Sequence, residues 1–385
     1  MARSEALVPR LALVILGTVA GLAAVEFGSR ILAARRSHYL DTITPYHTFF
    51  ERDPLVGHVH RLNAAMTIKR PDHPAGTIEM RTNNLGLRSD QDTAPVKPAG
   101  RYRILVVGDS HTEGYCFNGE TYPALLEALL RKRFPDQDIE VLNGGVAYYS
   151  PQQDYLHATQ LLSLRPDLIV VGLYAGNDLL DQVRDAASVS VPLLVDPWYL
   201  MLWENSQLFR SLQGVFQKIQ DRTDARPAEY AAALKRGSDV NGPAVWQALN
   251  QALYFHYFPA EMPAAEIRVQ RTLAAFKRLC EGSCEVLVFV IPAKVSTELD
   301  ADATTLESLG RLMGLDPEAL RLDAVVAIDF ARLARETGLP ALSLATPCPT
   351  AECYYKSDYH LNPDGNQLAA SSLAPWIEDT MLSPR

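Results

Sequence analysis

The sequence predicts an α/β protein in which a parallel sheet is covered by helices. Residues 167–174 read DLIVVGLY, and a strand with so continuous an apolar run is buried on both faces, as in a parallel sheet. Apolar residues then recur at helical intervals from Tyr122 to Leu130, which places them on one face of a helix. Residues 150–153, SPQQ, form a capping box with proline at the first helical position and begin another helix. Such alternation is typical of strands joined by crossover helices.

Strands and helices are expected in alternation along the chain. The first strand, RILVV at 103–107, ends at Gly108, and the last helix begins at Asn362-Pro363, a capping residue followed by proline. The predicted strands lie at 103–107, 138–142, 167–174, 286–291 and 341–344, and the predicted helices lie at about 122–130, 150–163 and 266–280, in a stretch up to 337, and after 362.

Composition excludes several classes of protein. Hydrophobic residues make up 48% of the 385-residue chain and charged residues 21%, which excludes a disordered chain and a membrane protein of many spans. The chain has 45 acidic and 36 basic residues, a formal net charge of −9. With no basic surplus to neutralise a phosphate backbone, nucleic acid is not expected as a partner.

The N-terminal segment is typical of export or membrane attachment. Residues 11–25 read LALVILGTVAGLAAV, and Arg3 and Arg10 precede them. We therefore predict a signal anchor or transmembrane segment over residues 1–36, with a cleaved signal peptide as the alternative, because the run also fits a signal-peptide core of about 7–15 residues. Together with the close cysteine pairs further along the chain, this segment predicts that the rest of the protein is periplasmic or otherwise extracytoplasmic.

The rest of the chain divides into an extension and a main domain. Residues 37–100 are rich in His, Pro, Asn and Asp without a sustained helical period, so we expect short strands and loops. The main domain covers residues 101–385. Its alternation is interrupted at about 182–261, where tryptophan, tyrosine and phenylalanine accumulate, and we interpret this stretch as a mainly helical insertion.

Four cysteines form two close pairs along the chain: Cys280 with Cys284, and Cys348 with Cys353. In an exported protein such pairs predict two local disulfides. A four-cysteine zinc site and free thiols remain the alternatives, although the spacing lacks the C-x-x-C knuckles of most structural zinc modules.

Chemistry-bearing residues follow the ends of the predicted strands. Ligands of open parallel sheets bind beyond the carboxyl ends of the strands, where loops and helix N-termini converge. Polar or glycine-rich loops lie at these ends or just before the last helix: Gly108-Asp109-Ser110, NGGV at 143–146, Gly176-Asn177-Asp178 and Asp358-Tyr359-His360.

These loops contain the parts of an acyl-transfer site. A serine becomes nucleophilic when a base takes its proton and a third group orients that base, and Ser110, His360 and Asp358 fit these roles. An oxyanion needs donors aimed at it, which the backbone N–H groups of Ser110 and Gly145 and the Asn177 amide can supply. This chemistry needs no cofactor or metal. His58 and His60 share a strand face, but two ligands make no metal site.

The four blocks resemble those of the SGNH, or GDSL-type, hydrolase family, here GDSHTEG at 108–114, NGGV at 143–146, GND at 176–178 and SDYH at 357–360. The resemblance implies a flavodoxin-like three-layer α/β/α sandwich. It also implies that Ser110 is the nucleophile, that Gly145 and Asn177 complete the oxyanion hole, and that His360 is the base.

One position departs from the family's commonest pattern, in which Asp stands three residues before His. Ser357 occupies that position, and Asp358 stands two residues before His360. The Asp-x-His spacing is similar to that of SGNH-like enzymes that acetylate exported polysaccharides.

We therefore expect a serine-dependent ester hydrolase that removes O-acyl, chiefly O-acetyl, groups from a cell-envelope or exported glycan. The first alternative is an O-acetyltransferase acting on an exported polysaccharide, since the same triad serves both reactions. The second is a non-catalytic glycan-binding or assembly scaffold, whose cellular role would survive the loss of the Ser110 hydroxyl. Glycan identity rests on location and resemblance, because fold does not specify substrate.

Overall fold

The computed structural model describes residues 7–33, 48–183, 201–202, 205–209, 212, 229–230, 232–233, 236, 249–298, 303–316, 318–344, 353–356 and 359–382. The chain divides into two compact units. The smaller comprises residues 1–46 and 193–226, and the larger comprises residues 47–192 and 227–385.

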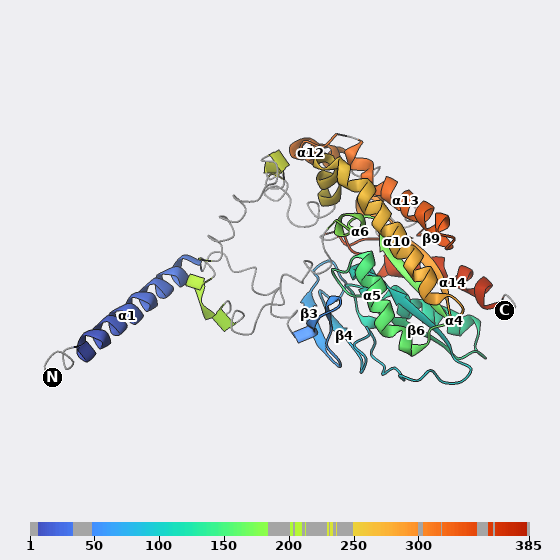
Figure 1. Ribbon diagram of the computed structural model, residues 1–385, viewed down its shortest axis with the longest axis horizontal. Helices are drawn as coiled ribbons and strands as arrows, with labels where there is room; N and C mark the ends of the chain where they lie inside the picture. The colour runs from blue at the N-terminus through green and yellow to red at the C-terminus, as the bar shows by residue number, and fades with distance from the viewer. Residues whose placement is uncertain are drawn as a thin grey trace. The chain divides into compact units, whose positions relative to one another are not determined.

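The larger unit is built on the predicted parallel sheet (Figure 1). Its five strands are ordered β6-β5-β7-β8-β9, and every neighbouring pair is parallel. Numbered along the sheet's own chain order this is 2-1-3-4-5, the flavodoxin-like order, and the predicted fold class is confirmed. The strands are β5 (Tyr102–Val107), β6 (Ile139–Asn143), β7 (Leu168–Tyr174), β8 (Glu285–Ile291) and β9 (Ala341–Ser343).

Helices cover both faces of this sheet (Figure 1). Alternate side chains of β5 point to opposite faces. Ile104 and Val106 join the core with α4 (Tyr122–Arg133) and α14 (Pro363–Leu382). Leu105 and Val107 join the core with α5 (Pro151–Leu161), α10 (Met262–Cys280) and α13 (Leu322–Glu336). The long helices of the larger unit are α4 (Tyr122–Arg133), α5 (Pro151–Leu161), α10 (Met262–Cys280), α12 (Ala303–Met313), α13 (Leu322–Glu336) and α14 (Pro363–Leu382). Shorter helices are α3 (Ser110–Glu113), η1 (Asn118–Glu120), η2 (Leu162–Leu164), α6 (Asp178–Asp181), η3 (Pro259–Glu261), α11 (Lys294–Glu298) and η4 (Ala319–Arg321).

Two helix starts predicted from capping residues are confirmed. The Ser150 hydroxyl accepts the Gln153 N–H while the Gln153 side chain accepts the Ser150 N–H, which forms the expected capping box at α5. At α14 the Asn362 Oδ1 atom accepts the Gly365 N–H at 2.9 Å, so this side chain caps the N-terminus of the helix that follows His360.

Four short strands precede the sheet and pair as two antiparallel hairpins. β1 (Phe50–Asp53) pairs with β2 (Gly57–His60), and β3 (Ala65–Lys69) pairs with β4 (Thr77–Arg81). They fall within the segment predicted to be strand and loop.

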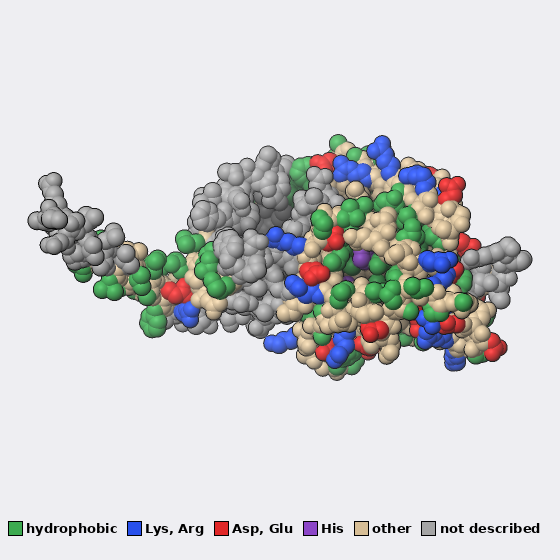
Figure 2. All heavy atoms as spheres, turned by 60° about the horizontal axis from the view of Figure 1, so that its bottom comes forward, with side chains coloured by type: hydrophobic (Ala, Val, Ile, Leu, Met, Phe, Trp, Pro, Cys, Tyr) green, Lys and Arg blue, Asp and Glu red, His purple; other side chains and the backbone are tan. Residues whose placement is uncertain are grey.

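On the face shown in Figure 2, apolar side chains gather near the centre of the larger unit and charged side chains lie mainly toward its margins.

The described part of the insertion predicted at 182–261 is helical where it joins the core. Residues 249–257 are helical, and η3 follows. The Tyr230 ring meets those of Tyr254 and Phe258 at centroid distances of 6.1 and 5.4 Å, so these aromatic side chains pack against one another in the core. Most of residues 184–248 lie outside the described residues.

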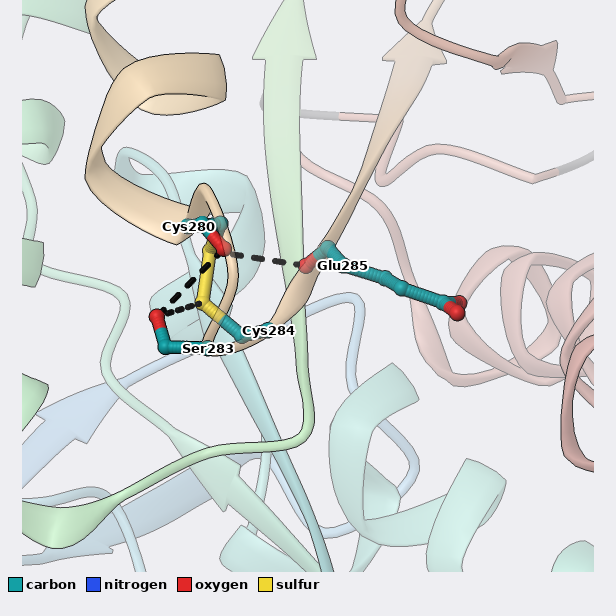
Figure 3. The surroundings of a disulfide bond; sticks show 4 residues. All are labelled: Cys280, Ser283, Cys284 and Glu285. Carbon is teal, nitrogen blue, oxygen red and sulfur yellow. Dashed lines mark hydrogen bonds between the residues drawn. A yellow bond between two sulfur atoms is a disulfide. The ribbon is translucent and has the colours of Figure 1, made fainter. Parts of the chain in front are cut away.

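The Cys280–Cys284 disulfide joins the end of α10 to the residue before β8 (Figure 3). These two sulfurs are bonded to each other, so they are not zinc ligands. Cys353 is also disulfide-bonded, whereas Cys348 lies outside the described residues. Cys116 is a buried free thiol.

The smaller unit contains α1 (Leu7–Ala33), which covers the apolar run of the N-terminus. Glu26 pairs with Arg30 at 2.7 Å and accepts hydrogen bonds from the Gln207 and Leu208 backbone N–H groups. Across the described ranges, no helix combines the length and the hydropathy required to cross a membrane.

Candidate active site

The predicted nucleophile stands at the first turn of α3, directly beyond the carboxyl end of β5. Asp109 caps this helix, its Oδ1 accepting the His111 N–H at 2.9 Å. A side chain at Gly108 would place its Cβ 2.2 Å from Thr112 Oγ1 and 2.9 Å from the Gly172 carbonyl oxygen. The strand can therefore turn this sharply into the helix only with glycine at that position.

The predicted base lies against the nucleophile, with His360 Nε2 2.8 Å from Ser110 Oγ. Both residues are buried, at 6% and 8% exposure. The imidazole contacts the rings of Tyr115 and Tyr359, at centroid distances of 4.2 and 4.4 Å. With Nε2 unprotonated, the Ser110 hydroxyl donates to it, which is the geometry of general-base activation.

Asp358, the predicted third member of the triad, lies outside the described residues together with Ser357. Its role in orienting His360 therefore stays a prediction.

Gly145 packs directly on the nucleophile helix. A Cβ there would lie 2.3 Å from the Glu113 nitrogen and 2.5 Å from the Thr112 carbonyl carbon, so the two backbones can touch only because the residue is glycine. Its N–H, the predicted oxyanion donor, donates to Asn143 Oδ1 at 3.0 Å. An oxyanion that uses this donor must therefore compete with the Asn143 side chain.

Asn177 stands at the N-terminal end of α6, beyond β7, as predicted. Its Nδ2 donates to Asp181 Oδ2 at 2.6 Å, and its Oδ1 is buried without a hydrogen-bond partner among the described residues. Since an amide nitrogen carries two hydrogens, one N–H is held by Asp181 and the second can serve an oxyanion.

Buried carboxyl groups surround these loops. Burial, together with the neighbouring charges of Asp181 and Glu113, raises the pKa of Asp109 to about 7. Asp178 Oδ2 accepts the Tyr174 N–H at 2.7 Å, and burial raises the pKa of this carboxyl well above its usual range, with Asp109 as the next cause. Both groups hold their protons more tightly than an exposed aspartic acid does, because the charged form is poorly solvated there.

The two histidines of β2 bind protein groups of the site. His58 Nε2 lies 2.8 Å from the Ala147 carbonyl oxygen, and His60 Nε2 lies 2.6 Å from Glu113 Oε1. Among the described residues, no group of three or more His, Cys, Asp or Glu side chains is placed to hold a metal ion.

Sequence reasoning did not identify Tyr115 or Arg88 as site residues. Tyr115 packs on the catalytic imidazole, and Arg88 binds the backbone that follows the nucleophile. Neither carries a motif or a strand-end position of its own, so only a contact prediction between distant segments could have found them.

The doubly wound sheet, with a serine and a histidine in hydrogen-bonding contact at its strand ends, defines a serine hydrolase site. Residues 106–368, more than half of the chain, match the GDSL-like Lipase/Acylhydrolase family. The chain belongs to this family, which confirms the resemblance noted in the sequence, and it is a carboxylic ester hydrolase.

Several solved structures are similar at low identity. Axe2, an acetylxylan esterase from Geobacillus stearothermophilus, is 13% identical with a TM-score of 0.38, covering 72% of this chain and 94% of its own. A two-domain esterase active on acetylated mannans is 16% identical with a TM-score of 0.36, covering 74% of this chain and 52% of its own. The esterase EstA from a Pseudoalteromonas species is 10% identical with a TM-score of 0.37, covering 73% of this chain and 99% of its own. No match to a curated protein was found.

Proposed function

We propose that the protein hydrolyses O-acyl esters, chiefly O-acetyl esters, of an exported or cell-envelope glycan, with Ser110 as nucleophile and His360 as base. The observation that carries the chemistry is the 2.8 Å contact between His360 Nε2 and Ser110 Oγ. The glycan is proposed from the N-terminal segment and from the Asp-x-His spacing of the last block.

The reaction proceeds in two halves. His360 Nε2 takes the Ser110 proton as the hydroxyl oxygen attacks the ester carbonyl carbon. The tetrahedral oxyanion is held by N–H donors of Ser110, Gly145 and Asn177. The intermediate then expels the alcohol, which receives the proton from His360, and leaves an acyl group on Ser110.

Water completes the cycle. His360 takes a proton from water as the water oxygen attacks the acyl carbon, and the proton returns to Ser110 as the carboxylic acid leaves. A sugar hydroxyl in place of this water would make the enzyme an O-acetyltransferase.

Extracytoplasmic location belongs to the same proposal, with the domain held by its N-terminal segment or released after cleavage. It is supported by the Cys280–Cys284 disulfide, because disulfides persist in oxidising compartments and are rare in the cytosol.

The test measures p-nitrophenyl acetate turnover by the full chain and by Ser110→Ala and His360→Ala variants. We expect kcat to fall by roughly 10³-fold or more for Ser110→Ala and by about 10²–10⁴-fold for His360→Ala. His256→Ala, at an exposed histidine that contacts Tyr257, is the control. Turnover by Ser110→Ala at the wild-type rate would overturn the mechanism.

The substrate is tested separately by acetate release from acetylated oligosaccharides, with and without an unacetylated acceptor. Free acetate as the main product supports the hydrolase, and acetylated acceptor as the main product supports the transferase. Efficient cleavage of long-chain p-nitrophenyl esters without any reaction on acetylated glycans would contradict the glycan part while leaving the serine mechanism in place.

A further inference from the structure

The segment before the sheet contacts the nucleophile loop although it lies outside the family match at 106–368. Arg88, in this segment, is 3% exposed. Its guanidinium donates to the carbonyl oxygens of Glu113, Gly114 and Cys116 at 3.1, 3.0 and 2.9 Å, and to Asn118 Oδ1. The Arg88 side chain thus binds three backbone carbonyl oxygens and one side-chain oxygen, all in residues 113–118.

These carbonyls need a donor from elsewhere in the fold. The helix that begins at Ser110 ends at Glu113, and the last carbonyls of a helix have no intrahelical partner. A buried carbonyl without a hydrogen bond destabilises the fold, because the group has lost its water without gaining a partner. The planar fork of arginine supplies several donors at once, which a lysine ammonium cannot reproduce in the same geometry.

Arg88 also contacts the second loop of the site. Its backbone N–H donates to the carbonyl oxygen of Asn143, the last residue of β6, at 3.1 Å. The Asn143 side chain in turn accepts the Gly145 N–H and donates to the Glu113 carbonyl oxygen at 3.4 Å. Residue 88 therefore contacts both loops, the nucleophile loop through its guanidinium and the Gly145 loop through its backbone N–H.

The base is linked to this arrangement through Tyr115. Two of the carbonyls bound by Arg88, those of Gly114 and Cys116, flank Tyr115 in the chain. The Tyr115 ring packs 4.2 Å from that of His360, and its carbonyl oxygen accepts the Tyr355 hydroxyl at 2.9 Å. A shift of the backbone at 114–116 would move the ring that supports the imidazole.

We propose that Arg88 is a positioning residue for ester hydrolysis. It holds the nucleophile loop, the Gly145 loop and the Tyr115 ring in one arrangement around Ser110 and His360. The proposal rests on the proposed serine mechanism, and it assigns to the N-terminal strand-and-loop segment a direct part in the geometry of the site. Arg88 touches no reacting atom, so it acts through the backbone that it binds.

The test compares Arg88→Lys with Arg103→Lys in the full chain. Arg103 is a matched control because it is 0% exposed and its guanidinium also binds several oxygens, those of Glu140, Leu164 and Ala94 at 2.6, 2.7 and 3.0 Å. It lies near the start of β5, at the opposite end of that strand from Ser110. Both variants lose a buried guanidinium, but only one loses it beside the site.

We expect Arg88→Lys to lower kcat on p-nitrophenyl acetate by about 100-fold, the cost of a misplacement near 1 Å, with KM within about threefold because ground-state binding is little changed. Arg103→Lys should lower Tm about as much as Arg88→Lys does, and it should keep kcat within about twofold of the wild-type value. Ser110 should also react more slowly with a fluorophosphonate in Arg88→Lys than in Arg103→Lys.

Rates are divided by the concentration of sites that the fluorophosphonate labels at completion, so a partly folded preparation still yields kcat per folded site. Unchanged kcat per site in Arg88→Lys, or equal losses in the two lysine variants, would overturn the positioning role. Turnover by Ser110→Ala at the wild-type rate would instead overturn the serine mechanism, so the two failures are distinguishable.

Discussion

His360 Nε2 lies 2.8 Å from Ser110 Oγ although 250 positions separate the two residues in the chain. Ser110 follows the first strand of the parallel sheet, whereas His360 precedes its last helix. The contact forms because the loop after β5 and the loop before α14 both lie at the edge formed by the carboxyl ends of the parallel strands. The rings of Tyr115 and Tyr359 then hold the imidazole in place, so packing orients the base in addition to any carboxylate partner.

Removal of the Asn177 side chain should slow the chemical step. If its second amide hydrogen holds the oxyanion, Asn177→Ala should lower kcat by about 10²–10³-fold with little change in KM. Asp181→Asn, which removes only the charge from the carboxylate that binds Asn177 Nδ2, should cost less. Steady-state kinetics on p-nitrophenyl acetate measure both, and a change confined to KM in Asn177→Ala would argue against the oxyanion role.

Gly145→Ala should disrupt the contact between the two site loops. The new Cβ would lie 2.3 Å from the Glu113 nitrogen, and a backbone that must shift to admit it costs about 1–3 kcal/mol. We expect a lower Tm and a loss of activity greater than the unfolded fraction explains. Gly119→Ala is the control, since nothing lies within 4 Å of its Cβ position. Equal behaviour of the two variants in thermal melts and turnover would refute this packing argument.

A rise in pH from acid to about 8 should destabilise the protein through Asp323. Burial raises the pKa of this carboxyl to about 8, whereas an unfolded Asp titrates near about 3.9. The folded chain therefore holds a proton that the unfolded chain has released, and the stability present in acid is lost progressively as the pH rises from about 4 to about 8.

Asp323→Asn should remove this pH dependence, because an amide oxygen can still accept the Gln251 Nε2 hydrogen bond seen at 2.7 Å. The Tm of Asp323→Asn minus that of the wild type should be larger at pH 9 than at pH 5. The increase should be at least roughly 2–4 °C, the shift expected for about 1 kcal/mol. Asp136→Asn, at an exposed position, should follow the wild type. Parallel Tm curves for wild type and Asp323→Asn would contradict the prediction.

Removal of the Cys280–Cys284 disulfide should lower stability without abolishing activity. The bond closes a short loop with a sequence separation of 4, for which loop-closure entropy gives about 2 kcal/mol. A Cys280→Ser/Cys284→Ser double variant should melt at lower temperature and keep kcat within about twofold. Cys116→Ser, at the buried free thiol, controls for the loss of sulfur itself. Complete loss of turnover in the folded double variant would show that this disulfide supports the site.

Much of the fold and part of the site could be predicted from local sequence. The apolar run of 167–174 and the capping box at Ser150 depend on residues close together in the chain, so periodicity and capping rules apply to them. Ser110 and His360 were found because parallel strands place their carboxyl-end loops at one edge. The sequence therefore determined the sheet, its order of elements and the pair of residues most suited to nucleophile and base.

Tertiary structure alone decided how the donors of the site are engaged. The Gly145 N–H donates to Asn143, the Asn177 amide is shared with Asp181, and Arg88 binds the carbonyls after Ser110. The Arg88–Glu113 contact joins positions 25 apart in the chain, which only packing brings within about 3 Å of each other. The other two contacts span 2 and 4 positions, but they depend on the loop conformation that the surrounding packing imposes. Local patterns do not predict such contacts, because neither a loop conformation nor a hydrogen bond between distant segments requires a periodicity in the sequence.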